Sequence, residues 1–199
     1  MDQPTTRVQH SGVSNMNAAA EVRPCIVAIM GLPGAGKSTV ARAIEQELAM
    51  RRVCRDAIRA AMFPTCDHSY VEKRAAFRSV LLALEINCAL GASSVVDGMT
   101  FSRRDDYERV AALAHEHGAD IVPLLVECAP ALARVRIAKD GSNHPAGDRE
   151  PALVDEIAAR FDAPPEHALR VDASLSVSVM CRQAVTAVAA RLGSGPIRA

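Results

Sequence analysis

The chain has 199 residues, of which 49% are hydrophobic, and its 23 basic and 23 acidic residues give a formal net charge of zero. This length suits one α/β domain with a sizeable core, and the ordinary share of charged residues argues against a largely disordered protein. A protein that mainly binds nucleic acid usually carries an excess of basic residues and aromatic side chains that stack on bases. In this sequence aromatic residues are 3% and Trp is absent. Nucleic acid is therefore a disfavoured partner.

Cysteine usage and hydropathy favour a cytoplasmic protein. No two of the six cysteines form a C-x-x-C pair, and Cys25, Cys88 and Cys128 lie among apolar neighbours, where a thiol behaves as a small hydrophobe. We expect reduced core thiols. No segment reaches the ~18 apolar residues of a membrane span, and the first 22 residues lack an apolar signal region. We therefore expect no membrane partner.

The N-terminal half of the chain alternates an apolar strand pattern with helical patterns. Residues 25–30 form a continuous apolar run closed by Gly31, which predicts a strand buried on both faces. A short extended piece is predicted over residues 52–54. Helices are predicted over three segments, 38–51, 56–62 and 71–90.

The C-terminal half continues this alternation. Strands are predicted over residues 93–97, 121–128 and 169–172. Helices are predicted over residues 103–117, 130–139, 150–161 and 177–192. Strands that alternate with helices imply right-handed crossovers, so we expect a three-layer α/β fold with a mostly parallel central sheet. Ligands of such folds bind at the carboxyl ends of the strands.

The same patterns divide the chain into one domain and two tails. Residues 1–22 are polar and mixed and are interpreted as an N-terminal tail, within which Met16 is an alternative start to Met1. The domain is predicted over residues 23–192, with a C-terminal tail over 193–199. A segment rich in Gly, Pro, Asn and Asp suggests a small lid at about residues 139–150.

A phosphate-binding loop follows the first predicted strand. The pattern G-x-x-x-x-G-K-[ST] is matched, and the predicted nucleotide site comprises Gly31, Leu32, Pro33, Gly34, Ala35, Gly36, Lys37, Ser38 and Thr39. Glycines let backbone N–H groups turn around an anion, Lys37 would reach the β- and γ-phosphates, and Ser38 would ligate magnesium. The alternative is a glycine-rich turn that binds nothing, but the flanking strand and helix favour ATP and Mg²⁺ as cofactors. The guanine-reading motif N-K-x-D of switch GTPases does not occur in the sequence, which argues against a GTPase.

Four segments together resemble the small P-loop kinase group. They are GLPGAGKST, RDAIR at 55–59, VVDGMTFSRR at 95–104 and ARVRIAKD at 133–140. The group includes the polynucleotide 5′-kinase domain, chloramphenicol phosphotransferase and many uncharacterised kinases, and the resemblance covers roughly residues 24–172. It implies the fold of P-loop NTPases and ATP-dependent phosphoryl transfer.

The most diagnostic part of the resemblance is D-x-x-R, matched by Asp56 and Arg59. In the group the aspartate acts as general base on the acceptor hydroxyl, and the arginine holds the acceptor or the transferring phosphate. An acceptor hydroxyl with a pKa far above 7 gains from a carboxylate within hydrogen-bond reach. Asp56 could instead, or also, be the N-cap of a short helix.

Asp97 ends an apolar strand, as the second acid of P-loop enzymes does, and could bind magnesium or orient the acceptor. The plainer alternative is a turn residue in Asp-Gly. Arg103 and Arg104 match basic positions of the group, and Arg104 is the predicted substrate ligand. A solvated helix start explains either arginine equally well.

Arg136 matches the first lid arginine of the group, which clamps the nucleotide phosphates. The group often has a second arginine four residues later, where this chain has Asp140. Lys139 or Arg149 could substitute, although lysine offers a point charge rather than a fork. The predicted catalytic set is therefore Lys37, Asp56, Arg59 and Arg136.

The sequence thus predicts an ATP-dependent kinase that phosphorylates a hydroxyl of a small molecule such as an antibiotic, nucleoside or sugar. One alternative is a polynucleotide 5′-hydroxyl kinase, which zero net charge and scarce aromatics disfavour. Another is a nucleotide-binding regulatory or toxin-like module whose output is a partner interaction. The acceptor and the oligomeric state are not encoded in any recognisable motif.

Overall fold

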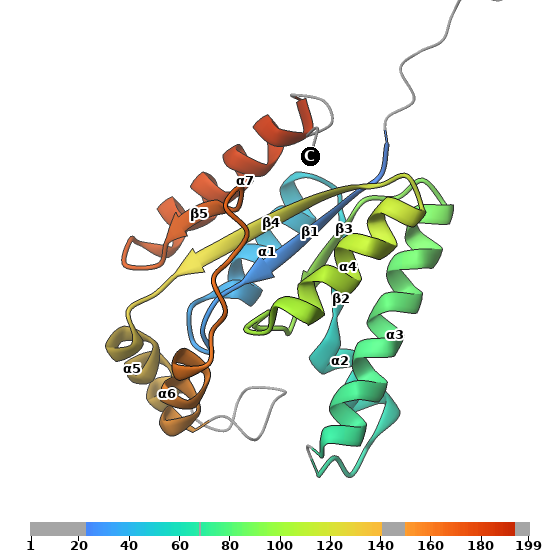
Figure 1. Ribbon diagram of the computed structural model, residues 1–199. Helices are drawn as coiled ribbons and strands as arrows, with labels where there is room; N and C mark the ends of the chain where they lie inside the picture. The colour runs from blue at the N-terminus through green and yellow to red at the C-terminus, as the bar shows by residue number, and fades with distance from the viewer. Residues whose placement is uncertain (1–22, 68, 141–149, 194–199) are drawn as a thin grey trace, which may run out of the picture.

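The computed structural model describes residues 23–67, 69–140 and 150–193, which alternate between strands and helices (Figure 1). The strands are β1 (Cys25–Met30), β2 (Arg51–Cys54), β3 (Ser94–Asp97), β4 (Asp120–Glu127) and β5 (Leu169–Asp172). The helices are α1 (Lys37–Glu47), α2 (Arg55–Met62), α3 (Tyr70–Ala89), α4 (Arg104–Glu116), α5 (Pro130–Asp140), α6 (Pro151–Ala159) and α7 (Val177–Gly193).

The described strands form one sheet in the order β2-β3-β1-β4-β5, and each neighbouring pair is parallel. β1 occupies the centre, and its six residues are all buried, as its continuous apolar sequence predicts. The predicted α/β fold with a mostly parallel sheet is confirmed, and among the described residues the sheet is parallel throughout.

Helices cover both faces of the sheet and give it two cores. Cys25, Val27 and Ile29 of β1 pack in a core with α1 and α7, whereas the alternate residues of the strand pack with α3 and α4. Figure 1 shows these two helix layers on opposite sides of the strands. A strand has a side-chain period of two, so one apolar run supplies both cores.

The predicted helix over residues 38–51 is wrong at its C-terminal end. α1 ends at Glu47, Ala49 has φ 52°, and Arg51 already belongs to β2, where it pairs with Ser94 of β3. Arg51 and Arg52 have good helix propensity, but strand pairing in the sheet overrides that weak local preference. The helix predicted over 150–161 likewise ends earlier, at Ala159.

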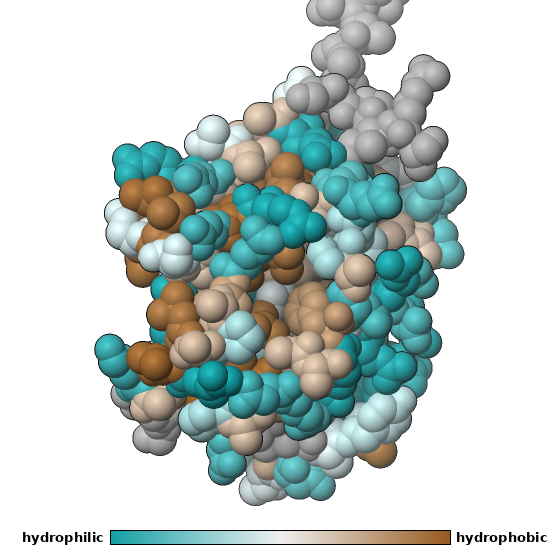
Figure 2. Space-filling model, turned by 60° about the vertical axis from the view of Figure 1, so that its left-hand side comes forward, coloured by the Kyte–Doolittle hydropathy of each residue, from teal (hydrophilic) through white to brown (hydrophobic). Residues whose placement is uncertain are grey.

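The carboxyl ends of β1, β2 and β3 all carry segments that the sequence singled out. Gly31 follows β1, Asp56 lies in the first turn of α2 directly after β2, and Asp97 ends β3. Parallel strands place their carboxyl ends at the same edge, so these segments meet. Figure 2 brings this side of the molecule forward and shows a hollow between polar rims with apolar side chains in it. The predicted tail 1–22 and loop 141–149 lie outside the described residues.

Candidate active site

The segment between β1 and α1 turns so tightly that glycine is required at two positions. Gly31 has φ +138° and Gly34 has φ +77°, conformations that residues with a Cβ atom rarely adopt. A Cβ atom would lie 2.6 Å from the Val126 carbonyl oxygen at Gly31, and 2.6 Å from the Ala133 carbonyl oxygen at Gly34. Gly31 and Gly34 therefore allow the loop to fold against β4 and α5.

Helix α1 begins at Lys37 directly after this loop. Its N-cap, Gly36, provides no side-chain cap, and no acidic residue lies in the first turn. The positive end of the helix is thus left for an anion. Lys37 is 6% exposed, and its Nζ donates to the carbonyl oxygens of Gly31 at 2.9 Å and Leu32 at 2.8 Å. The ammonium therefore lies across the loop that would hold phosphates.

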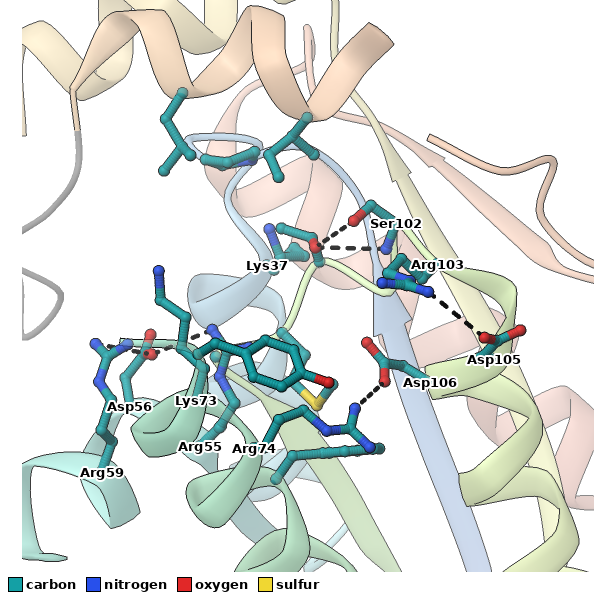
Figure 3. Close-up of a pocket in the computed structure, with 18 of the residues that line it drawn as sticks. Lys37, Arg55, Asp56, Arg59, Lys73, Arg74, Ser102, Arg103, Asp105 and Asp106 are labelled. Carbon is teal, nitrogen blue, oxygen red and sulfur yellow. Dashed lines mark hydrogen bonds and ion pairs between the residues drawn. The ribbon is translucent and has the colours of Figure 1, made fainter. Parts of the chain in front are cut away.

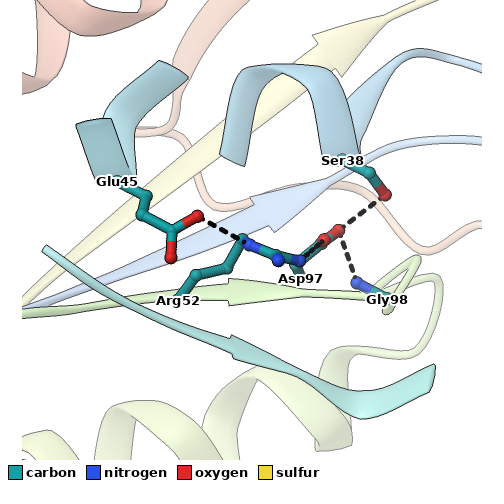
Figure 4. A network of polar contacts seen from close by, with 5 residues as sticks. All are labelled: Ser38, Glu45, Arg52, Asp97 and Gly98. Atoms are coloured by element: carbon teal, nitrogen blue, oxygen red, sulfur yellow. Dashed lines mark hydrogen bonds and ion pairs between the residues drawn. The ribbon is translucent and has the colours of Figure 1, made fainter. Parts of the chain in front are cut away.

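Ser38 and Asp97 lie in contact and form an oxygen-rich pair beside the loop (Figure 4). The Ser38 hydroxyl donates to Asp97 Oδ1 at 2.8 Å, and the Gly98 N–H donates to the same oxygen at 2.7 Å. Asp97 Oδ2 accepts from Arg52 Nη1 at 3.1 Å, and Arg52 Nε in turn donates to Glu45 at 2.9 Å. Burial alone would lower the pKa of Arg52, but its hydrogen bonds to Glu45 and Asp97 raise it.

This donor set fits magnesium. Mg²⁺ prefers oxygen ligands and is held by one or two protein groups together with phosphates and water. Within residues 23–67, 69–140 and 150–193, no cluster of three or more His, Cys, Asp or Glu side chains is arranged to hold a metal ion. The hydroxyl of Ser38 and the carboxylate of Asp97 suit a metal that phosphates would mostly coordinate.

Asp56 in the first turn of α2 faces Arg59 in the last turn of the same short helix, next to the end of β3. Arg59 Nη2 lies 3.4 Å from Asp56 Oδ1, and Arg55 Nη2 lies 3.6 Å from the same oxygen. Asp56 is 6% exposed and Arg59 is 2% exposed. A Cβ atom at Gly98 would lie 2.9 Å from the Asp56 nitrogen, so only glycine lets β3 and α2 approach this closely.

Three buried polar atoms of this cluster have no hydrogen-bond partner in the described structure: Arg55 Nε, Asp56 Oδ1 and Arg59 Nη2. The two arginines are close enough to Asp56 for ion pairing, yet these atoms do not meet it in hydrogen-bond geometry. Buried polar groups are nearly always satisfied in folded proteins. Unsatisfied donors and acceptors at one place indicate a position for a ligand.

A pocket of about 440 Å³ joins the loop side to the Asp56 side, and Figure 3 shows its walls. The lining includes five predicted site residues, which the structure thus brings together: Pro33, Lys37, Ser38, Asp56 and Arg59. This volume lies within the range of pockets for small ligands. Sequence reasoning did not single out several charged residues of its walls: Arg55, Lys73, Arg74, Asp106, Arg109 and Arg160.

The missed residues of α3 lie on one face of the helix. Tyr70, Lys73, Arg74 and Phe77 are spaced by three and four residues and all line the pocket. The Arg74 guanidinium lies 5.3 Å from the centroid of the Phe77 ring and donates to Asp106 of α4 at 3.0 Å. The 3.6-residue periodicity of this helix could have predicted that these residues share a face. It could not have predicted that this face meets the pocket.

Several predicted site residues lie outside this pocket lining, among them Asp97, Arg104 and Arg136. Arg136 of α5 donates to the carbonyl oxygens of Ala35 at 3.3 Å and Ala173 at 2.7 Å, so it ties the phosphate loop to the segment after β5. The backbone N–H of Arg104 donates a hydrogen bond to Asp162 Oδ2 at 2.8 Å. The neighbouring residue, Arg103, lines the pocket instead.

The two proposed substitutes for a second lid arginine are placed unequally. Lys139 is exposed near the end of α5, whereas Arg149 and most of the predicted lid fall outside the described residues.

All six cysteines are free. Burial raises the pKa of the Cys25 thiol to about 12, with Asp120 and Cys88 adding to the effect, and it also raises the pKa of Cys88. No helix in the described part of the chain is long and apolar enough to cross a bilayer.

Comparison with known proteins identifies a family and a fold. A family model described as an AAA domain matches residues 26–164, which is more than half of the chain. No curated protein matches the sequence.

Solved structures provide the likeness in fold. A proposed kinase from Chloroflexus aurantiacus is 21% identical, with a TM-score of 0.72 over 87% of this chain and 98% of that one. A gluconokinase from Sinorhizobium meliloti has 15% identity and a TM-score of 0.67 over 86% and 95%. The APS kinase of Mycobacterium tuberculosis, solved with AMPPNP and APS, has 17% identity and a TM-score of 0.65 over 87% and 99%.

Proposed function

The chain belongs to this AAA-domain family of small P-loop kinases, and on that premise we propose that it is an ATP-dependent phosphotransferase acting on a hydroxyl of a small molecule. One observation carries the proposal. The buried carboxylate of Asp56, with an unsatisfied oxygen, lines the same pocket as Lys37 and Ser38. An acceptor hydroxyl in that pocket would therefore meet both a base and the phosphate-binding loop. The structures similar in fold include a gluconokinase and an APS kinase, which supports a small-molecule acceptor.

On the nucleotide side, the loop amides and the positive end of α1 would hold the phosphates of ATP. Lys37, which rests on two loop carbonyls, would turn its ammonium to the β- and γ-phosphates. Ser38 and Asp97 are the residues that would hold magnesium, which when bound neutralises phosphate charge. Arg136 already bonds to the Ala35 carbonyl of the loop, which supports a role next to the nucleotide phosphates.

On the acceptor side, Asp56 would take the proton of the attacking hydroxyl. The hydroxyl oxygen forms a bond to the γ-phosphorus, and the bond from that phosphorus to the β–γ bridging oxygen breaks and releases ADP. Charge spreads over the transferring group, and the Arg59 guanidinium beside Asp56 would offset it. Arg103, which lines the pocket, is better placed than Arg104 to contact the acceptor.

The test is an ADP-release assay with Mg-ATP and a panel of hydroxyl compounds, including neutral sugars, nucleosides, sugar acids and a 5′-hydroxyl oligonucleotide. We expect one small molecule to stimulate ADP release. Asp56→Asn should lower that stimulation by about 10²-fold or more, because the amide cannot accept the proton. ATP affinity should stay within about twofold, because the substitution is isosteric.

Two variants serve as controls. Glu85→Gln neutralises an exposed acid on α3 and should leave transfer unchanged. Lys37→Ala should abolish transfer by removing the cation of the loop. Normal turnover in Asp56→Asn would refute the base assignment. Clear ATP binding with no stimulation by any acceptor would favour a nucleotide-binding regulatory module instead.

A further inference from the structure

The pocket is strongly cationic in a chain that is neutral as a whole. Eight basic and three acidic side chains line it, whereas the full chain has 23 of each. Lys37 serves the phosphate loop, and two of the three acids, Asp105 and Asp106, lie beside arginines, at 3.6 Å from Arg103 and 3.0 Å from Arg74. A large positive excess therefore remains on the walls, beyond what the loop contributes.

This excess is concentrated around the acceptor side of the pocket. Figure 3 shows Arg55, Arg59 and Lys73 next to Asp56, whereas the Arg74 side chain extends from the same side of the pocket to Asp106. Arg55 and Arg59 come from α2, and Lys73 and Arg74 come from α3, so two helices supply them independently. The Asp56 carboxylate faces two guanidinium groups, those of Arg55 and Arg59, and a further anion would offset the charge that remains.

Two of these cations have buried donors that nothing in the described structure satisfies, namely Arg55 Nε and Arg59 Nη2. A buried N–H without a partner costs free energy, whereas a carboxylate, phosphate or sulfate oxygen offers an acceptor of the right charge. Arg74 is held in place by Asp106 and by the ring of Phe77, so its position is fixed before a ligand arrives.

We infer that the phosphate acceptor is itself an anion: a small molecule that carries a carboxylate, phosphate or sulfate group besides the hydroxyl that receives the phosphoryl group. Arg55, Lys73 and Arg74 form its anion subsite. The inference rests on the proposed function and narrows its substrate class. The pocket volume of about 440 Å³ favours a small molecule over a polymer end.

The first experiment measures binding without turnover. The protein is saturated with magnesium and a non-hydrolysable ATP analogue, which fills the phosphate loop, and is then titrated with sulfate against chloride at equal ionic strength. We expect saturable thermal stabilisation by sulfate. Arg74→Glu and Lys73→Glu should each weaken it about tenfold or more, because they place like charge at the subsite.

Arg78→Glu is the matched control. It makes the same charge change one turn further along α3, at an exposed position outside the pocket lining. Arg78→Glu should retain the thermal stabilisation by sulfate. The comparison with this variant therefore separates binding at the subsite from general effects of salt and of net charge. Equal loss in Arg78→Glu, or a wild-type response to sulfate no larger than the response to chloride, would overturn the subsite.

The second experiment measures ADP release with acceptor pairs that share their hydroxyl pattern and differ in charge: sugar acid and sugar alcohol, sugar phosphate and sugar, nucleotide and nucleoside. We expect the charged member of the productive pair to have kcat/KM at least about tenfold higher. Arg74→Glu should remove that preference through KM while the KM for ATP stays unchanged.

The outcomes separate the two proposals. Equal or better use of the neutral members would overturn the anionic acceptor and leave the kinase standing. Stimulation by the 5′-hydroxyl oligonucleotide alone would overturn the small-molecule form of the inference. If nothing stimulates ADP release, the proposed function fails, and the sulfate titration still decides whether the anion subsite exists.

Discussion

At the scale of single residues, Asp97 uses both carboxylate oxygens within the protein. One oxygen accepts from Ser38 and Gly98, and the other accepts from Arg52. Asp97 is 2% exposed, and a buried charge is tolerated only when it is paired and hydrogen-bonded. The contact with Arg52 therefore fixes the direction in which Asp97 presents its other oxygen to Ser38.

We predict that Ser38→Ala weakens the binding of ATP about tenfold in the presence of magnesium and changes it little in the presence of a chelator. The hydroxyl is the group that would ligate the metal, whereas the loop amides hold the phosphates without it. Calorimetric titration with ATP, with and without magnesium, measures both affinities.

Ser38→Thr is the control, because it keeps the hydroxyl and should bind Mg-ATP like the unmodified protein. An equal loss of affinity with and without magnesium in Ser38→Ala would show that the serine acts on the loop and not on the metal.

At the scale of secondary-structure elements, β1 shows how a buried strand changes the chemistry of its side chains. Cys25 is fully buried in the core beneath α1 and α7. Desolvation by burial disfavours the thiolate and raises the pKa of Cys25 from 9.0 to about 12, with the charge of Asp120 adding to the effect. The thiol is therefore a packing group and not a nucleophile.

This shift predicts how stability depends on pH. Below pH 9 the thiol is protonated in both states, so its contribution to stability is fully present. Between pH 9 and about 12 the unfolded state releases a proton that the folded state keeps. The free energy of unfolding should then fall by up to about 1.4 kcal/mol per pH unit because of Cys25.

Denaturant unfolding at several pH values from 8 to about 10.5 measures this slope. Cys25→Ala should be less stable at pH 8 because it leaves a cavity, yet its stability should fall less steeply above pH 9. Parallel pH profiles for the two proteins would contradict the assignment.

At the scale of the whole molecule, the candidate site exists because distant segments meet at one edge of the sheet. The Ser38–Asp97 contact joins residues 59 apart, and Arg74 meets Asp106 across 32 residues. The unfolded chain has none of these contacts, so a nucleotide held by the loop binds the folded state alone. Ligand binding and global stability are linked for this reason.

We predict that Mg-ATP at about 100 times its dissociation constant stabilises the protein by about 2.7 kcal/mol, which corresponds to a rise in Tm of roughly 5–10 °C at this chain length. Lys37→Ala should lose most of this shift. Arg42→Ala, at an exposed position of the same helix, should keep it. Thermal unfolding with increasing Mg-ATP measures all three, and an equal shift in Lys37→Ala would refute the nucleotide site.

The sequence by itself determined the features that depend on neighbouring residues. The apolar run of β1 predicts a strand buried on both faces, and the spacing of Gly31, Gly34 and Gly36 predicts the turn that their positive φ angles confirm. Strand–helix alternation predicts the parallel sheet. These signals are local because backbone sterics and side-chain periodicity act over a few residues.

Only the tertiary structure decided which side chains share a space. It ends α1 at Glu47, places Arg103 and not Arg104 in the pocket wall, and turns Lys73 and Arg74 of α3 into the same pocket as Asp56. Helix periodicity fixes which residues share a face, but the packing of that helix on the sheet fixes what the face meets. The glycine-rich loop could therefore be predicted from sequence, whereas the cationic wall of the pocket could not, because its residues come together only through contacts between separate elements.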